Sequence, residues 1–552
     1  MEEFKLIIEI IGGFLWNNYT LYAVVATGVV FTIWSGFSQY YALTHGFKVV
    51  KGDYDKDSDP GAISHFQALS TALSATVGLG NIGGVALAIS LGGPGAVFWM
   101  WVVGFLGMAI KLSEVSLSMI HRNIDEADNP SGGPMWVVER NFANKSGLLK
   151  VLGKFIAGTF CVALIVNTIT AGNMFQAWNV ANLTEAYFGV PTIVTGLVLA
   201  IIVGSVIIGG IKRIGAVTSK LVPFMLIIYV LACIYVLALN FSSIPEMLSL
   251  IVTAAFSPME SSNAFLGGTA GSAFIFGMQR ALFSNEAGQG SSAIAHSAAK
   301  TDEPIREGVV AGLEPFIDTI VVCTMSALVI LVTGIWNRPA EVQLTEVVIA
   351  QEGQTWSLDG SFEDKESLKE GAKVFMIYSG SENTDSGNAL NKVYGTVMVE
   401  NSSKSIQWDR IKSQKIPNTD GAIYLDYVGA NLTAAAFDEV SSGLGKWLVT
   451  LASWLFAIST MISWSYYGEK GVAFLMGEKA ILTYKLSFCA LAVLSTTGFI
   501  QTDRELNLFA NLGTGLCIMA NLPILWLFGY QAIRDYKVYI AKLKAGNFHR
   551  GQ

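Results

Sequence analysis

Residues 70–91 read Ser70-Thr-Ala-Leu-Ser-Ala-Thr-Val-Gly-Leu-Gly-Asn-Ile-Gly-Gly-Val-Ala-Leu-Ala-Ile-Ser-Leu91. The run is apolar and long enough to cross a bilayer, yet glycines at positions 78, 80, 83 and 84 interrupt its centre. A break inside a membrane helix is tolerated only where the freed backbone groups face a cavity lined by protein. The stretch therefore predicts a broken transmembrane helix beside a site for a small polar solute.

The same stretch contains the pattern G-x-G-x-x-G at residues 78–83, which also occurs in dinucleotide-binding proteins. That motif requires a preceding β-strand, a soluble βαβ unit and an acidic residue about 20 positions later. Here an Ala/Ser/Thr-rich helix precedes the glycines, and the apolar run from Gly92 to Ile110 follows them. We therefore reject dinucleotide binding.

The composition indicates a membrane protein before any motif is considered. Of 552 residues, 52% are hydrophobic and 14% charged, against about 25% charged residues in soluble domains. The net charge of −7 provides no basic surface for nucleic acid, and the N-terminus lacks the basic region of a signal peptide. The five cysteines are scattered singly through apolar segments, which predicts packing residues rather than disulfides or a metal site.

Hydropathy over windows of about 20 residues predicts about eleven transmembrane spans. The predicted spans are 21–41, 66–91, 95–120, 151–178, 192–210, 221–239, 264–299, 307–336, 445–467, 480–499 and 506–528. The chain is therefore expected to be an all-α polytopic membrane protein.

A second interrupted span contains Phe274-Ile-Phe-Gly-Met-Gln-Arg-Ala-Leu-Phe-Ser-Asn-Glu-Ala-Gly-Gln-Gly-Ser-Ser-Ala-Ile-Ala-His-Ser297. It lies about 200 residues after the first, at the matching place in the second half of the chain. Two such segments in two halves indicate an inverted repeat with a binding site near the midplane of the membrane.

Residues 337–442 differ in composition from the rest, because they are polar and contain short alternating runs such as 373–378 and 393–400. We expect a small β-rich extramembrane insert there, with a disordered loop as the alternative. The predicted domains are an N-terminal segment with an extra helix (1–60), the first half (61–241), the start of the second half (242–336), the insert (337–442), the rest of the second half (443–530) and a tail (531–552).

Basic residues of the short loops predict the orientation in the membrane. With eleven spans, the basic residues of segments 48–56, 121–150, 212–220, 300–306, 470–479 and 534–544 all fall on one side. That side should be the cytoplasm. We expect a multi-pass protein of the cell (inner) membrane, with the N-terminus and the insert extracytoplasmic and the C-terminus cytoplasmic.

Several motifs in sequence order carry a resemblance. They are Ser74-Ala-Thr-Val-Gly-Leu-Gly-Asn-Ile-Gly-Gly-Val-Ala, Gly92-Gly-Pro-Gly-Ala-Val-Phe-Trp-Met-Trp101, Gly132-Gly-Pro-Met, Phe283-Ser-Asn-Glu-Ala-Gly-Gln-Gly290, Gly312-Leu-Glu-Pro-Phe-Ile-Asp-Thr319 and Ser463-Trp-Ser-Tyr-Tyr-Gly-Glu-Lys470. Together they resemble the alanine or glycine:cation symporter family over nearly the whole chain, apart from an atypically large insert. The resemblance implies the five-plus-five inverted-repeat fold of amino-acid–sodium symporters, with Na⁺ and a small neutral amino acid, alanine and/or glycine, carried together.

A zwitterion and a bare cation need different parts of a broken helix. The N–H groups at the start of a half-helix favour a carboxylate, and unwound carbonyl groups favour a cation. The resemblance then implies Gln176 for the substrate amino group, and Phe276, Met278 and Trp464 as walls around its side chain. The predicted substrate site comprises Thr76, Gly78, Leu79, Gly80, Asn81, Gln176, Phe276, Gly277, Met278 and Trp464.

For sodium, the resemblance implies the carbonyl oxygens of Ser74 and Val77 and the hydroxyls of Ser459 and Thr460. Ordinary hydroxyl packing between helices is the alternative for the last two residues.

The remaining charged residues of the spans are expected to have structural or gating roles. Glu286 is expected to cap a half-helix, Glu314 and Asp318 to lie near the cytoplasmic end, and His296 to pack or cap. Lys111 and Glu114 are expected to form a pair near a helix end that extends to the interface.

The sequence is also compatible with other functions. A proton-coupled symporter, a symporter of larger amino acids of the glutamine or serine type, and an amino-acid sensor using the insert are alternatives. An enzyme is disfavoured because the five histidines are spread thinly, and a channel because two broken helices surround a closed site. No organic cofactor, nucleic acid or protein partner is predicted beyond the lipid bilayer, although the insert offers a surface for an extracytoplasmic partner.

Overall fold

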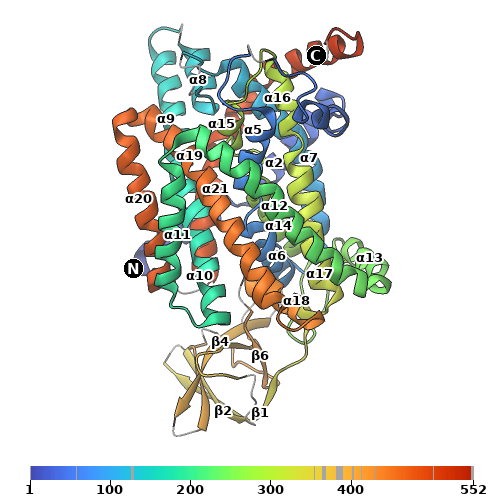
Figure 1. Ribbon diagram of the computed structural model, residues 1–552. Coiled ribbons are helices and arrows are strands. Elements are labelled where there is room, and N and C mark those ends of the chain that lie inside the picture. The colour runs from blue at the N-terminus through green and yellow to red at the C-terminus, as the bar shows by residue number, and fades with distance from the viewer. Residues whose placement is uncertain are drawn as a thin grey trace.

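The computed structural model describes residues 2–548 except 57–58, 126–129, 144, 354, 363–367, 381–389, 401–402, 412, 414, 428 and 501–502. Figure 1 shows a helical bundle with a small β-sheet at one end and the C-terminal segment at the other.

The helices up to residue 239 are α1 Glu2–Leu15, α2 Asn18–Ser35, α3 Gln39–Tyr41, α4 Phe47–Val50, α5 His65–Thr76, α6 Val85–Gly92, α7 Gly95–His121, α8 Pro134–Phe142, α9 Leu148–Ile169, α10 Phe175–Phe188, α11 Thr192–Ile207 and α12 Gly210–Leu239. Those after residue 239 are α13 Ile244–Ala254, α14 Ala270–Asn285, α15 Ser292–His296, α16 Pro304–Ala311, α17 Thr324–Val332, α18 Ala430–Val440, α19 Thr450–Met476, α20 Ile481–Leu494 and α21 Asp503–Lys544. Wider π-type turns join several of them: η1 Ala42–Gly46, η2 Gly80–Gly84, η3 Thr170–Met174, η5 Phe316–Cys323, η7 Gly445–Val449 and η9 Ser495–Phe499.

Seven helices in the described part of the chain are long and apolar enough to cross a membrane, and two bent pairs raise the number to nine. One bent pair is α5 with the helix from Gly80 to Gly92, which meet at 50°, so the predicted break is confirmed. The predicted spans 192–210 and 264–299 correspond to the shorter α11 and to α14 with α15. The count of eleven therefore stays a prediction.

Both interrupted segments begin with a capping box. Ser64 accepts a hydrogen bond from the Gln67 backbone N–H and opens α5, and Thr269 does the same for Ser272 in α14. They end differently, because α5 stops at Val77, with φ −77° and ψ 88°, whereas α14 stops at Glu286 in the left-handed region, with φ 56°.

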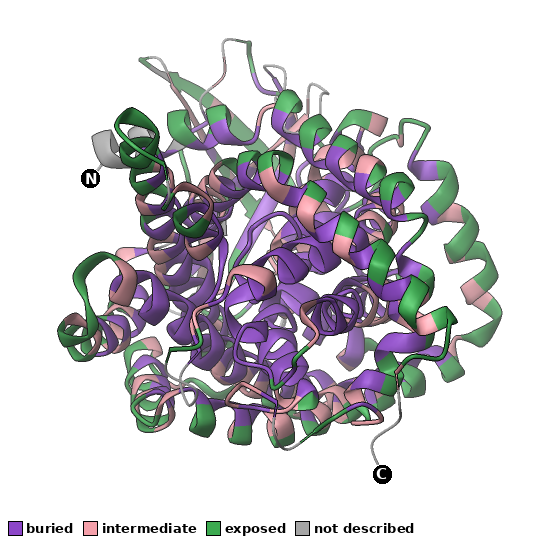
Figure 2. Cartoon of the chain, turned by 90° about the horizontal axis from the view of Figure 1, so that it is seen from above, coloured by how far each residue is buried: buried purple, intermediate pink, exposed green. Residues whose placement is uncertain are grey.

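The buried residues lie in the middle of the bundle and the exposed ones at its periphery, as the view from above shows (Figure 2). Large apolar side chains face outward from the peripheral helices, for example Ile201 of α11, Leu231 of α12 and Leu486 of α20. An apolar outer surface suits contact with lipid tails, and the chain is accordingly an integral membrane protein.

The insert contains an antiparallel sheet with the order β2-β1-β6-β3-β4-β5. The strands are β1 Val342–Glu352, β2 Thr355–Phe362, β3 Lys373–Ser379, β4 Leu390–Glu400, β5 Ser403–Trp408 and β6 Ala422–Leu425. Strands β3 and β4 cover the two alternating runs on which the β-rich prediction depended. The sheet is shorter than segment 337–442, because α18 returns to the bundle, where the Thr433 hydroxyl donates to the Ile82 carbonyl at 3.0 Å.

Candidate functional site: the break between two half-helices

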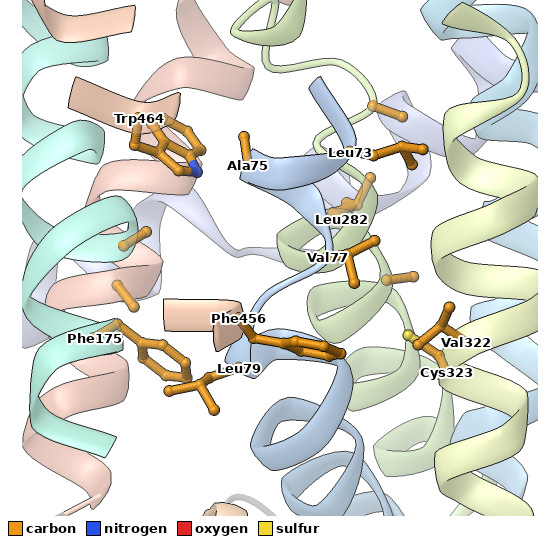
Figure 3. Packing of buried hydrophobic residues seen from close by; sticks show 14 of the residues in the cluster. Leu73, Ala75, Val77, Leu79, Phe175, Leu282, Val322, Cys323, Phe456 and Trp464 are labelled. Atoms are coloured by element: carbon orange, nitrogen blue, oxygen red, sulfur yellow. The ribbon is translucent and has the colours of Figure 1, made fainter. Parts of the chain in front are cut away.

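The first break places a short non-helical stretch of backbone in the middle of the bundle. Figure 3 shows Val77 and Leu79 on this stretch, with Trp464 and Phe175 on neighbouring helices. A Cβ atom on Gly78 would lie 2.5 Å from the Thr460 hydroxyl oxygen. Glycine at position 78 therefore lets α19 approach the broken backbone closely.

Two backbone N–H groups of the break point at side-chain amide oxygens. The Gly78 N–H donates to Asn81 Oδ1 at 2.9 Å, and the Leu79 N–H donates to Gln176 Oε1 at 3.1 Å. Oxygen acceptors with partial negative charge thus occupy the positions that a carboxylate would favour at the start of a half-helix. The arrangement can recognise an anionic oxygen without a charged side chain.

Asn81 also fixes the break from the other side. Its Nδ2 donates to Asp318 Oδ1 at 2.6 Å and to the Ser284 hydroxyl at 3.1 Å. The amide therefore joins the first break to α14 and to η5. Asp318 therefore lies beside the first break. These contacts do not support the prediction that it lies near the cytoplasmic end.

A small buried cavity of about 10 Å³ lies beside the break. Its lining comprises Ala75, Thr76, Gly78, Gly80, Ala171, Gln176, Phe283, Gln289, Trp464 and Thr514. The volume corresponds to roughly one water molecule, so an amino acid would need the lining side chains to move apart.

The structure brings together one part of the predicted substrate site and separates another. Thr76, Gly78, Gly80, Gln176 and Trp464 line the cavity, and Leu79 and Asn81 make the contacts just described.

Phe276, Gly277 and Met278 lie elsewhere on α14. A Cβ on Gly277 would lie 2.4 Å from the Ala96 carbonyl oxygen of α7, and a Cβ on Gly92, at the end of α6, would lie 3.1 Å from Phe276 Cβ. Phe283, seven residues after Phe276 and hence on the same face of the helix, lines the cavity instead. That spacing is the sequence signal that could have identified it.

Gln289 and Thr514 also line the cavity, and neither is among the residues predicted from the sequence. Gln289 lies in the interruption after α14, where its Oε1 accepts a hydrogen bond from Asn167 at 2.8 Å. Thr514 comes from α21 and donates to Asn167 Oδ1 at 3.3 Å. Sequence carried a signal only for Gln289, which lies in the second interrupted segment.

Three of the four candidate sodium ligands, Ser74, Ser459 and Thr460, meet between α5 and α19. The Thr460 hydroxyl donates to the Ser74 carbonyl oxygen at 3.0 Å, and the Ser74 hydroxyl donates to the Ser459 carbonyl oxygen at 2.7 Å. The Ser459 hydroxyl donates to its own helix, at the Phe456 carbonyl. A hard cation prefers hydroxyl and carbonyl oxygens as ligands. Val77, the fourth candidate ligand, lies at the C-terminal end of α5, where the break begins.

The buried charges form a network that contradicts one expectation. Lys111 is fully buried and lies 3.3 Å from Glu314, while Glu114 accepts a hydrogen bond from Asn521. The predicted Lys111–Glu114 pair at the interface is therefore wrong, because Lys111 finds a carboxylate on another element. Glu286 ends α14, as expected of a capping residue.

A buried polar cavity at a broken membrane helix defines a class of protein, namely a membrane transporter of a small solute. The chain belongs to the sodium:alanine symporter family, whose model matches residues 1–362 and 418–551. It is thus a transporter and not an enzyme.

Individual relatives agree with this assignment. The sodium/alanine symporter AgcS of Methanococcus maripaludis is 35% identical over 547 residues, 99% of this chain and 100% of that protein. An uncharacterized transporter of Haemophilus influenzae is 30% identical, over 99% of this chain and 98% of its own. The probable sodium/glutamine symporter GlnT of Bacillus subtilis is 31% identical over 64% of this chain and 71% of its own.

Among solved structures, MhsT in complex with L-phenylalanine matches with a TM-score of 0.48 at 13% identity, over 87% of this chain and 99% of that chain. The family assignment rests on the sequence matches alone.

Proposed function

We propose that this protein couples the entry of sodium to the uptake of alanine and/or glycine by alternating access. The observation that carries the proposal is the pair of N–H groups at Gly78 and Leu79, held by amide oxygens beside a small buried cavity. Membership of the sodium:alanine symporter family and the similarity to AgcS support the same substrate and ion.

The substrate carboxylate would bind at the N–H groups of Gly78 and Leu79, where it replaces the amide oxygens of Asn81 and Gln176. Gln176 joins the break to its own helix, because its Oε1 accepts from the Leu79 N–H and its Nε2 donates to the Ala171 carbonyl at 3.2 Å. Released from Leu79, its Oε1 becomes available to the substrate ammonium group. A zwitterion is thereby bound at both ends by uncharged groups, and no bond is made or broken.

Sodium would bind between the break and α19, at Ser74, Val77, Ser459 and Thr460. Support comes from the hydrogen bonds that already join Ser74 to Ser459 and Thr460. A cation at this position would draw α5 and α19 together and order the N–H groups next to it. Sodium binding and carboxylate binding would then favour the same arrangement of the break.

Substrate size would be set by Trp464 and Phe283, which line the cavity from α19 and α14. A packed aromatic wall excludes large side chains because overpacking costs about 1–3 kcal/mol. This favours alanine and glycine over a glutamine-type substrate, which the similarity to GlnT would otherwise suggest.

For the architecture, we propose the five-plus-five inverted repeat, with α5–α6 and α14–α15 as the broken helices. The sheet and the C-terminal segment lie at opposite ends of the bundle, which supports an extracytoplasmic insert and a cytoplasmic C-terminus (Figure 1).

Binding of labelled alanine to the purified protein tests the proposal, measured with sodium and with potassium as the only cation. We expect saturable binding in sodium, inhibited by glycine, and none in potassium. Equal binding in potassium would remove sodium from the site, and binding of glutamine but not alanine would replace the substrate.

A further inference from the structure

A chain of five buried ionisable side chains lies outside the proposed substrate and sodium sites. They are His65 of α5, Lys111 of α7, His296 of α15, Glu307 of α16 and Glu314, which follows α16. Each is at most 1% exposed. In Figure 1, α5, α15 and α16 approach one another toward the end of the bundle opposite the sheet.

Their contacts run without interruption from one broken helix to the other. His296 Nδ1 lies 2.5 Å from Glu307 Oε1, and His296 Nε2 lies 2.7 Å from Glu314 Oε1. The other oxygen of Glu307 contacts His65 Nδ1 on α5. Glu314 Oε2 lies 3.3 Å from Lys111 Nζ, which donates to the Ser292 hydroxyl at 2.6 Å.

The contacts of His296 determine how many protons the cluster must hold. A neutral imidazole has one N–H donor and one bare nitrogen, which cannot donate to a carboxylate. Both ring nitrogens of His296 face carboxylate oxygens at hydrogen-bond distance. To hydrogen-bond both carboxylates, the cluster must therefore hold one more proton than a neutral histidine with two ionised carboxylates would hold.

The charge balance points to His296 as the group that carries this proton. Buried charges are tolerated when they are paired and hydrogen-bonded. Lys111 offsets one of the two carboxylates, and an imidazolium at His296 offsets the other. The contact of His65 with Glu307 is made through Nδ1 and needs only one N–H.

Further titratable groups face the cluster from the surrounding elements. They are Asp55, 3.7 Å from His65, together with Glu114, Arg122, Glu286 and Tyr467, which interact electrostatically with Lys111, Glu307 or Glu314. The three carboxyl groups among them favour a positive charge at His296 when they are ionised, whereas Arg122, which acts on Glu307, opposes it.

We propose that His296, Glu307 and Glu314 form a proton-binding site whose bound proton ties the two broken helices together. His296 belongs to α15, and its imidazolium binds Glu307, which in turn contacts His65 of α5. Opening of this end of the bundle would separate the two elements and let water reach the carboxylates. The proton would then exchange with solvent, since a hydrated histidine titrates near pH 6.5.

The protonation state of His296 can be measured directly in the full-length protein. Solid-state NMR on protein labelled with nitrogen-15 at histidine distinguishes imidazolium from neutral imidazole, and H296Q assigns the signal. At about pH 8 we expect both ring nitrogens of His296 to be protonated. His121 is the matched control, because its Nε2 faces the uncharged amide oxygen of Gln531 at 2.6 Å and a neutral ring suffices there.

If H296Q does not fold, E314Q provides the assignment, because removing one carboxylate partner should make the His296 ring neutral at the same pH. A neutral His296 at about pH 8 in the wild type would overturn the proposal, and so would an imidazolium that persists in E314Q.

The consequence for transport rests on the proposed alanine symport and has a separate test. Exchange of labelled alanine across proteoliposomes, with equal sodium on both sides, should speed up severalfold as the pH on the C-terminal side rises through the titration of His296. H296Q should abolish this dependence. If the exchange rate in the wild type does not depend on pH, the bound proton does not hold the two broken helices together, and this part of the proposal is refuted. If no alanine exchange is seen at all, the proposed function is refuted, while the NMR result on His296 still stands.

Discussion

The two interrupted segments solve the same structural problem with different chemistry. At the first break, backbone N–H groups of Gly78 and Leu79 bind the uncharged amides of Asn81 and Gln176. At the second, Glu286 accepts a hydrogen bond from Ser291, and His296 continues into a network of buried charges. The groups at the first break can exchange hydrogen-bond partners. At the second break, separating the paired charges would cost much free energy.

This difference supports the proposal that the first break binds the solute. An amide oxygen leaves an N–H group at a modest net cost of about 1 kcal/mol, provided that a carboxylate replaces it. A buried ion pair cannot be opened for a substrate without a penalty of several kcal/mol. The first break is suited to bind and release, whereas the second is suited to hold the bundle closed.

The largest expected effect concerns stability at the second break. Lys111→Met leaves Glu314 without its ammonium partner and should destabilise the protein by about 3–5 kcal/mol. Thermal unfolding in detergent measures the loss. Adding Glu314→Gln should restore part of it, since the uncompensated charge is then gone. A single variant as stable as the wild type would show that the pair does not hold the bundle.

Gln176→Ala should affect binding at the first break rather than stability. Loss of a polar partner in a buried site costs about 1–3 kcal/mol, or roughly 5-fold to 150-fold in alanine affinity. Equilibrium binding of labelled alanine measures it, with thermal unfolding as a check on the fold. The matched control is Asn182→Ala, which removes an amide of the same helix that donates to Trp178. Equal affinity in both variants would remove Gln176 from the site.

Selectivity at the first break should change when the wall is altered. Trp464→Ala should weaken alanine by about tenfold and admit serine, cysteine or valine, because a residual cavity disfavours the small ligand. Gly172→Ala is the reverse experiment, since its added methyl would meet the Trp464 ring at 2.3 Å and push it. Competition by a panel of amino acids gives the order of inhibition. An unchanged order in both variants would exclude Trp464 from the pocket.

The smallest effect is expected at the sodium ligands. Thr460→Ala should raise the sodium concentration for half-maximal alanine binding by a few-fold, corresponding to about 0.5–1.5 kcal/mol for one hydroxyl. Thr460→Ser should retain wild-type behaviour, and Ser463→Ala tests a buried hydroxyl one turn further along α19. A sodium midpoint that moves equally in the Thr460→Ala and Ser463→Ala variants would point to packing instead.

Sequence predicted the features that depend on local composition. The glycines of residues 78–84 break a helix wherever it packs, and a polar segment with alternating runs does not form a membrane span. For the same reason the first break, the strands β3 and β4 and most of the candidate site around Gly78 and Gln176 could be identified before the structure.

Sequence could not predict what depends on which elements meet. Lys111 and Glu114 lie three residues apart and suggest a pair on one helix, yet Lys111 is bound by Glu314, some 200 positions away, through the packing of α16 on α7. Thr514 likewise enters the cavity from α21, and Phe283 replaces Phe276 because α14 faces the break with its last two turns. These contacts are properties of tertiary packing.

The most direct test of the account is accumulation of labelled alanine in proteoliposomes under an inward sodium gradient. Each sodium ion moves one charge with a zwitterion, which is worth about 2.3 kcal/mol per 100 mV, and a tenfold gradient adds about 1.4 kcal/mol. One ion per substrate then permits roughly 500-fold accumulation. The account predicts sodium-driven accumulation that increases with an inside-negative potential. Accumulation driven by a proton gradient, with none from a sodium gradient, would contradict it.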